Sequence, residues 1–207
     1  MHSLTIEEVY NEHVGEYEKA VTLVKIWLDF LKSDSKLISK VESRIKTLES
    51  LREKCERKNV SPEEIQERIR DIGGIRLICK HREDVSKLVK AIKTLQLPGF
   101  SVVHEKDYNT NRKKNGYSGY HLECQVTVPT VDGNKPVPIE IQIRTASQDT
   151  FAVIEHDHYK EIVEAGIKYE EDDPETNKIL QDIAECCEKI DRLAGKLKAK
   201  TIKNPAD

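Results

Sequence analysis

The sequence predicts an α+β domain in which helices flank one mixed β-sheet and further helices are added at both ends. Two observations favour this class. Four or five segments with strand-like alternation come between helical segments, without the regular strand–helix repeat of a parallel sheet. Amphipathic periods of three and four residues occupy the two ends of the chain.

The first predicted helix spans residues 4–33. Its apolar residues recur at steps of three and four from Ile6 to Leu31, which places them on one helical face. The run Ser33-Asp34-Ser35 then supplies a break and a cap.

A short strand is predicted over residues 40–46. A continuous helix here would put Arg44 among apolar side chains, whereas a strand separates the two kinds. Its polar face then carries Glu42, Arg44 and Lys46. A helix follows over residues 47–58, and its spacing places three side chains on one face: Ser50, Lys54 and Arg57.

The middle of the chain alternates between helix and strand. Ser61-Pro62-Glu63-Glu64 is typical of a capping box with proline at the first helical position, and this short helix ends before Gly73-Gly74. The elements predicted next are a strand over 75–80, a helix over 83–95 and a strand over 101–108.

A basic, glycine-containing loop over residues 109–119 leads into a predicted hairpin. Its strands span 120–128 and 137–144, and Asp132-Gly133-Asn134 supplies the turn signal. Both strands alternate cleanly between apolar and polar residues.

The last part of the chain is predicted to be helical, with a helix from Ser147 to Ala165 and another over 176–200. An acidic linker from Glu170 to Glu175 separates them. The last helix carries one apolar stripe, formed by Ile179, Ile183, Cys187, Ile190, Ala194 and Leu197. We therefore expect a single domain over 1–207, with an N-terminal helix (1–34), a core (40–165) and a C-terminal helix (176–200).

Composition narrows the function less than the motifs do. The chain has 207 residues, 34% of them charged, and a net charge of only −3, which gives no global preference for nucleic acid or an anionic membrane. Five cysteines without a C-x-x-C pair indicate neither a disulfide framework nor a zinc site, so we expect a cytoplasmic protein. No apolar run approaches the ~20 residues that span a bilayer.

One face of the predicted sheet is polar. Alternation puts His121, Glu123 and Gln125 on the outward face of the first hairpin strand, and Glu140, Gln142 and Arg144 on that of the second. Taken alone, this pattern is more typical of a solvated outer face than of a site.

Three further features favour a phosphate site. Asp71 precedes Gly73-Gly74 and a strand, a position from which a carboxylate can reach a metal ion. Asp71 and Glu140 suit Mg²⁺, which is typically held by one or two carboxylates plus substrate phosphates. Cations gather at Arg44, Lys46, Lys54 and Arg57, and the loop combines Lys113 with an aromatic ring, Tyr117.

These residues together resemble a known family. The ordered segments RIKTLESLREK, DIGGIRL, KDYNTNRKKNGYSGYHL, EIQIRT and EHDHYK are similar to the synthetase domain of RelA/SpoT proteins over roughly residues 40–160. The chain looks like a stand-alone small alarmone synthetase. The resemblance implies a nucleotidyltransferase-like sheet and Mg²⁺-dependent transfer of the β,γ-pyrophosphate of ATP to the ribose 3′-hydroxyl of GDP or GTP.

The resemblance also implies a role for each site residue. Arg44 and Arg76 would contact ATP, with Arg76 near the adenine, and Lys46, Lys54 and Arg57 would neutralise its phosphates. Ser50, which shares a helical face with Lys54 and Arg57, is a further ATP-binding candidate. Asp71 would hold Mg²⁺, and Glu140 would approach the metal and accept the proton of the attacking hydroxyl. Tyr117 would stack on the acceptor base, while the acceptor phosphates and the site's orientation would depend on Lys113, His121 and Gln142.

Departures from the family pattern concern the acceptor loop. Ser118-Gly119 stands where arginine and serine are usual, and Arg112 stands in place of a common proline. Two alternatives therefore stay open: a toxin-like relative that modifies an adenosine nucleotide or a tRNA end, and a non-catalytic nucleotide or RNA-binding regulator. The expected partners are ATP and GDP or GTP, further copies of the chain in a tetramer, and single-stranded RNA as a regulator.

Overall fold

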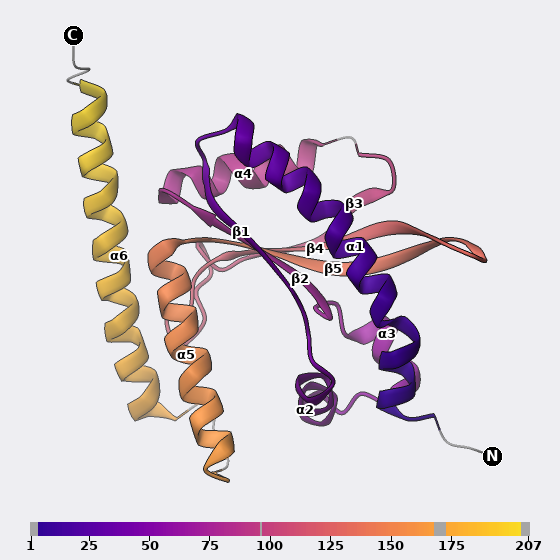
Figure 1. Ribbon diagram of the computed structural model, residues 1–207. Helices are drawn as coiled ribbons and strands as arrows, with labels where there is room; N and C mark the ends of the chain where they lie inside the picture. Colours follow the sequence, from indigo (N-terminus) through magenta and orange to yellow (C-terminus); the bar gives the residue numbers. More distant parts are fainter. Residues whose placement is uncertain (1–3, 96, 168–172, 204–207) are drawn as a thin grey trace.

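The computed structural model describes residues 4–95, 97–167 and 173–203, and it is built on one five-stranded sheet (Figure 1). The strand order is β1 (Ile38–Ile45), β2 (Gly73–Cys79), β5 (Gly133–Thr145), β4 (Tyr120–Thr130) and β3 (Phe100–Asp107). Only β2 and β5 pair in parallel, and the other neighbours pair antiparallel. The mixed sheet of an α+β protein is thus confirmed.

Helices begin where capping side chains satisfy the first backbone amides. Thr5, Thr47 and Thr145 each accept a hydrogen bond from the third residue of the helix that follows. The helices are α1 (Ile6–Asp34), α2 (Leu48–Lys58), α3 (Ile65–Arg68), α4 (Arg82–Thr94), α5 (Ala146–Glu164) and α6 (Pro174–Lys203), with a 3₁₀ turn at Pro62–Glu64. The long helices at both ends agree with the sequence prediction. That the chain forms a single domain stays a prediction.

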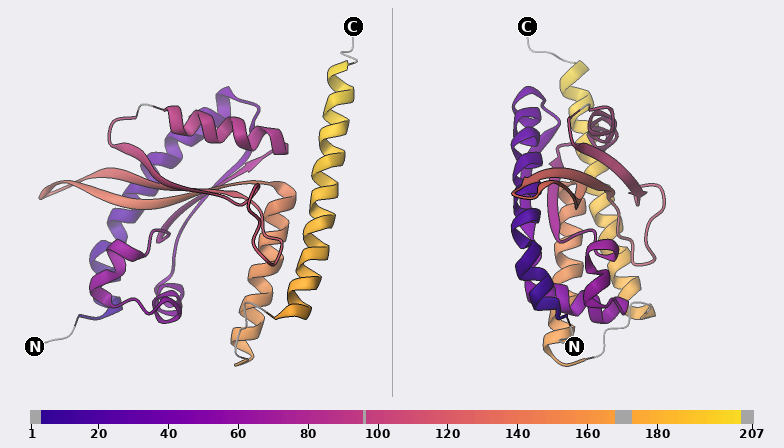
Figure 2. Two further views of the ribbon diagram at one scale, coloured as in Figure 1. Left: turned by 180° about the vertical axis from the view of Figure 1, so that it is seen from behind. Right: turned by 90° about the vertical axis from the view of Figure 1, so that its right-hand side faces the viewer.

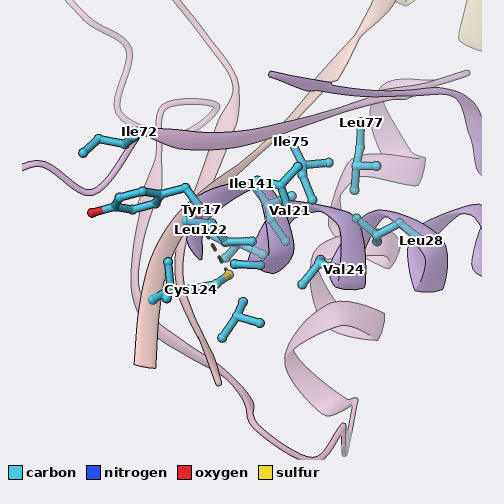
Figure 3. Packing of buried hydrophobic residues seen from close by; sticks show 14 of the residues in the cluster. Tyr17, Val21, Val24, Leu28, Ile72, Ile75, Leu77, Leu122, Cys124 and Ile141 are labelled. Carbon is cyan, nitrogen blue, oxygen red and sulfur yellow. Dashed lines mark hydrogen bonds between the residues drawn. The ribbon is translucent and has the colours of Figure 1, made fainter. Parts of the chain in front are cut away.

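The main core lies between the apolar face of the sheet and helices α1 and α4. Buried residues of α1, such as Val21, Val24 and Leu28, pack against the sheet interior, as Figure 3 shows for Ile75, Leu122 and Ile141. The predicted alternation therefore holds: apolar side chains of β2, β4 and β5 point to α1, and the polar ones point away.

Strand register sets which polar side chains become neighbours on the opposite face. In one row across the sheet, Arg44 pairs with Gly74, Gly74 with Glu140, and Glu140 with Glu123. In the next row, Glu42, Arg76, Gln142 and His121 lie side by side. Glu42 and Gln142, which are 100 positions apart in the sequence, thus meet in one row because the strand pairings coincide.

Helices α5 and α6 pack side by side at the end of the sheet where β5 leads into α5 (Figures 1 and 2). A second cluster joins them, formed by Tyr117, Phe151, Ala152, Leu180, Ala184 and Cys187. The predicted stripe of α6 is only partly right. Cys187 is buried, but Ile179, Ile190 and Leu197 are exposed, because Leu180 and Ala184 form the inner face instead. Residues 170–172 of the predicted acidic linker lie outside the described residues.

The hairpin turn also differs from its prediction. Pairing runs without interruption to Thr130 and Gly133, so the turn is Val131-Asp132 and not Asp132-Gly133-Asn134. Continued alternation of the two strands fixes this register, and Gly133 takes a positive φ of 116° at the start of β5.

In the part of the chain that the structure describes, no helix combines the length and apolar character needed to cross a membrane.

Gly73→Ala and Gly74→Ala should differ in their effect on stability, because the two glycines lie on opposite faces of β2. A Cβ at position 73 would lie 2.9 Å from Val21 Cγ2 and 3.1 Å from Ile139 Cγ2, so the core must shift. Such overpacking costs about 1–3 kcal/mol. A Cβ at position 74 meets its nearest neighbour, Arg44 Cγ, at an ordinary 3.6 Å. In urea unfolding we expect a loss for Gly73→Ala and a change within about 0.5 kcal/mol for Gly74→Ala. Equal losses would contradict this assignment of the faces.

Candidate active site

The polar face of the sheet is hollowed into a cleft of about 230 Å³. Its walls come from the central strands and from the segment before β2, and Gly74 leaves room between its two cross-strand neighbours. The lining residues are Glu42, Ser43, Arg44, Asp71, Gly74, Ile75, Arg76, Glu140 and Gln142. Five of these were predicted as site residues from the sequence: Arg44, Asp71, Arg76, Glu140 and Gln142.

At one end of the cleft, Asp71 forms ion pairs with two lysines. Its Oδ2 lies 2.5 Å from Lys54 Nζ and 3.5 Å from Lys46 Nζ, and all three side chains are mostly buried. Backbone pairing of Lys46 N with the Ile72 carbonyl holds the end of β1 against this segment. Burial would raise the pKa of Asp71, but the charges of Lys46 and Lys54 lower it below its ordinary value. Asp71 therefore stays ionised.

Glu140 projects from the middle of β5 and is held from two sides. His121 Nδ1 lies 3.0 Å from its Oε1, and Gln142 Nε2 donates to its Oε2 at 2.6 Å. Burial opposes ionisation, but the hydrogen bonds from His121 and Gln142, the His121 charge and nearby Lys54 bring the pKa of Glu140 down to about 2. The carboxylate is thus charged and oriented across the neutral pH range.

The contacts of Glu140 continue into a closed ring of hydrogen bonds. His121 Nε2 lies 2.6 Å from the Tyr117 hydroxyl, and Arg144 Nη2 donates to that hydroxyl and to Gln142 Oε1, each at 2.8 Å. His121 thus presents Nδ1 to Glu140 and Nε2 to the Tyr117 hydroxyl. The ring Glu140–His121–Tyr117–Arg144–Gln142 therefore locks these five side chains relative to one another.

The loop over residues 109–119 is folded back against α6. Gln181 Nε2 donates to the Lys114 carbonyl at 2.6 Å, Arg112 pairs with Glu188, and Asn115 Nδ2 donates to Glu155 Oε1 at 2.6 Å. Lys113 Nζ lies 5.0 Å from the centre of the Tyr117 ring. Tyr117 itself is only 3% exposed, so its ring is covered in this structure and is not available for stacking. Burial raises the pKa of Tyr117 to about 12, against the opposing charge of Arg144.

The remaining predicted residues lie around the cleft with different partners. Arg76 contacts Asp149 and Glu42, whereas Arg44 is exposed at the rim. Arg57 lies over the Tyr159 ring at 5.7 Å, which joins α2 to α5 across the site. Ser50 does not line the cleft; its hydroxyl accepts from the Thr47 hydroxyl at 3.1 Å, within the first turn of α2.

The donor set fits a metal ion that is completed by substrate oxygens. Asp71 Oδ1 is buried without a hydrogen-bond partner, which leaves one carboxylate oxygen free to coordinate. Among the residues that the structure describes, no group of three or more His, Cys, Asp and Glu side chains could hold a metal. One or two carboxylates plus phosphate oxygens is the arrangement that Mg²⁺ accepts.

Arg144 and Asp149, which hold other site residues in place, were not identified as site residues from the sequence. Arg144 was predicted only as part of the polar face, and Asp149 was not singled out. Arg144 Nη1 donates to Asp149 Oδ1 at 3.2 Å. Strict alternation along β5 was the available signal for Arg144, whereas a carboxylate in the first turn of a helix is ordinarily explained by the helix dipole.

Comparison with known proteins places this geometry in a family. A family model described as a region found in RelA/SpoT proteins matches residues 43–164. The GTP pyrophosphokinase YjbM of Bacillus subtilis (strain 168) is 34% identical over 182 residues, which cover 84% of this chain and 82% of the relative. YwaC, a GTP pyrophosphokinase of the same organism, is 36% identical over 124 residues, or 59% of this chain and 58% of the relative.

Solved structures agree over nearly the whole chain. Small alarmone synthetase 1 of Bacillus subtilis bound to its product pppGpp superimposes with a TM-score of 0.82 at 28% identity, over 94% of this chain and 98% of the other. The same synthetase bound to AMPCPP gives a TM-score of 0.73 at 25% identity, with the same coverage. The matched family region includes every predicted site residue from Arg44 to Gln142, and with a relative at 34% identity over most of its length it follows that this chain belongs to the RelA/SpoT family.

Proposed function

We propose that this protein is a GTP pyrophosphokinase, a small alarmone synthetase that makes (p)ppGpp from ATP and GDP or GTP. One observation carries the proposal. Two ionised carboxylates, Asp71 and Glu140, line one cleft on the polar face of the sheet, and Lys46 and Lys54 pair with Asp71 at its end. Transfer of a phosphoryl-type group depends on positioning and charge neutralisation more than on covalent help from the protein. ATP and guanosine nucleotides as substrates suit a cytoplasmic enzyme.

The reaction joins the acceptor to the donor at one phosphorus atom. The ribose 3′-oxygen of GDP or GTP bonds to the β-phosphorus of ATP, the bond from that phosphorus to the α,β-bridging oxygen breaks, and AMP leaves. Lys46 and Lys54, which now pair with Asp71, are placed to neutralise the donor phosphates. Arg44 and Arg76 line the same cleft and bind the rest of ATP.

Mg²⁺ bound at Asp71 would polarise the phosphate oxygens and offset the charge that develops on the transferring group. The free Asp71 Oδ1 supplies the first ligand. Glu140 is the second candidate: each of its oxygens accepts one hydrogen bond, from His121 or from Gln142, and would keep a lone pair for the metal.

The low pKa of Glu140 limits its work as a base. A carboxylate with a pKa near 2 accepts a proton from a hydroxyl only weakly at neutral pH. Its contribution is therefore to orient the 3′-hydroxyl as a hydrogen-bond acceptor, and it takes the proton only late, as the new P–O bond forms and makes that proton acidic. With Mg²⁺ bound, Glu140 would also help to hold the metal. This role explains why Gln142 and His121 fix both oxygens of one side chain.

The alternatives differ from this proposal in product. A toxin-like relative would modify an adenosine nucleotide or a tRNA end, and a non-catalytic regulator would bind nucleotides or single-stranded RNA without turnover. Incubation with ATP, Mg²⁺ and each acceptor, followed by identification of the product, separates the three. We expect a 3′-pyrophosphorylated guanosine nucleotide and AMP.

Removal of either carboxylate charge should abolish transfer. Asp71→Asn and Glu140→Gln keep the side-chain shape but remove the metal ligand, so turnover should fall by far more than about tenfold. Asp132→Asn is the matched control, because Asp132 is an exposed carboxylate in the hairpin turn. Turnover and thermal melting are measured together. Activity within about tenfold of wild type in either folded variant would refute the assignment.

Tyr117 should determine affinity for the acceptor and not for ATP. Tyr117→Ala removes the ring that would stack on the base, so the acceptor KM should rise by about tenfold or more while the KM for ATP is nearly unchanged. Tyr117→Phe keeps the ring and loses only its contacts with His121 and Arg144, so it should raise the acceptor KM less. A larger effect on the KM for ATP would mean that the two nucleotide sites are interchanged.

The chain should assemble into an oligomer, which we propose to be a tetramer. Helix α1 exposes Leu23, Ile26 and Phe30 on one face, and α6 exposes a further apolar set. Light scattering at micromolar concentration should report a species larger than a monomer. Phe30→Glu should shrink it without lowering the melting temperature, whereas Val131→Glu, at an exposed position of the hairpin, should leave it unchanged. A monomeric wild type would contradict the proposal.

A further inference from the structure

Asp149 contacts two arginines that belong to different parts of the site. Its Oδ1 lies 3.2 Å from Arg76 Nε and 3.2 Å from Arg144 Nη1. Arg76 lines the cleft proposed for ATP, and Arg144 holds the Tyr117 hydroxyl on the acceptor side. One carboxylate oxygen in the first turn of α5 is therefore shared between the two sides.

Arg144 holds Asp149 Oδ1 more strongly than Arg76 does. Arg144 is 5% exposed, and Asp149 supplies the carboxylate that faces this buried cation. Arg76 is less buried, its Nε makes no well-directed hydrogen bond, and Glu42 Oε2 offers it a second carboxylate at 3.7 Å. Arg76 can therefore leave Asp149 at little cost, whereas Arg144 cannot.

A change at Arg76 reaches the acceptor side in two steps. When a bound donor engages Arg76, Asp149 is left to Arg144 alone, and their ion pair strengthens. Arg144 holds Asp149 through Nη1, and Tyr117 and Gln142 through Nη2, so a shift of the guanidinium toward Asp149 lengthens its hydrogen bond to the Tyr117 hydroxyl. One of the contacts that keep the Tyr117 ring covered is thereby weakened, which favours its release toward the acceptor.

We propose that Asp149 is a positioning residue that couples the donor and acceptor sites of this enzyme through Arg76 and Arg144. This inference rests on the proposed function, because it takes ATP and a guanosine nucleotide as the two ligands. The consequence is positive linkage: each nucleotide binds more tightly when the other is present, by the same factor.

The test measures binding without turnover. Calorimetry gives the affinity for GDP with and without α,β-methylene ATP, whose bridging carbon prevents transfer. In the wild type the analogue should tighten GDP binding by about fivefold or more. In Asp149→Asn the effect should fall to within about twofold, while each nucleotide alone binds within about threefold of wild type. If the substitution only disturbed the structure, it would instead weaken the binding of each nucleotide alone. The factor by which the analogue tightens GDP binding would then be unchanged.

Asp132→Asn is the matched control, because it makes the same change at an exposed carboxylate of the hairpin turn, outside the cleft. It should keep the wild-type linkage. Arg144→Lys, which keeps the buried charge but loses the fork that joins Asp149 to Tyr117, should lose the linkage and takes the place of Asp149→Asn if that variant does not fold. Full linkage in Asp149→Asn or Arg144→Lys, no linkage in the wild type, or equal loss in Asp132→Asn overturns the inference.

Turnover of the wild type with GDP and GTP is measured first. Absence of a guanosine product would remove the proposed function, and with it the reason for choosing these ligands. Normal turnover without linkage would overturn only the coupling role of Asp149.

Discussion

The parallel pairing of β2 with β5 at the centre of the sheet is the constraint on which the rest of the structure depends. It puts Gly74 beside Glu140 and Arg76 beside Gln142, and the outer strands extend these two rows with Arg44 and His121. A shift of one residue would turn every one of these side chains into the apolar core. The dense packing under α1, where even a methyl group at Gly73 does not fit, therefore protects the chemistry on the other face.

Charge in the cleft is balanced without substrate by pairing within the protein. Lys54 and Lys46 form ion pairs with Asp71, and Glu140 forms hydrogen bonds with His121 and Gln142. Burial lowers the pKa of Lys46, against the opposing charge of Asp71. The charged pair of Lys46 and Asp71 is therefore partly desolvated, which costs free energy. The proposed polyphosphate substrate and its metal would offer the lysines and the carboxylate new partners, so binding would offset this desolvation.

The sequence was sufficient for the local structure and for the faces of the strands. Alternation predicted β4 and β5 and put His121, Glu140 and Gln142 together, because strand periodicity is a property of neighbouring residues. It could not predict that Tyr117 is buried under α6 or that Asp149 reaches both Arg76 and Arg144, since those contacts depend on how α5 and α6 dock. The inner face of α6 was missed for the same reason: two apolar faces were available, and only docking selects Leu180 and Ala184.

Burial of Tyr117 sets an energetic condition on the acceptor. To stack on a base, the side chain must give up its hydrogen bonds with His121 and Arg144 and its packing against Phe151 and α6. Each hydrogen bond has a net worth of about 0.5–1.5 kcal/mol, whereas stacking returns about 1–3 kcal/mol per base. The exchange is close to even, so the base alone cannot open the loop. In the proposed acceptor site, the phosphate tail would supply the remainder through Lys113 and the freed His121, which would make the site select a nucleotide with a charged tail over a nucleoside.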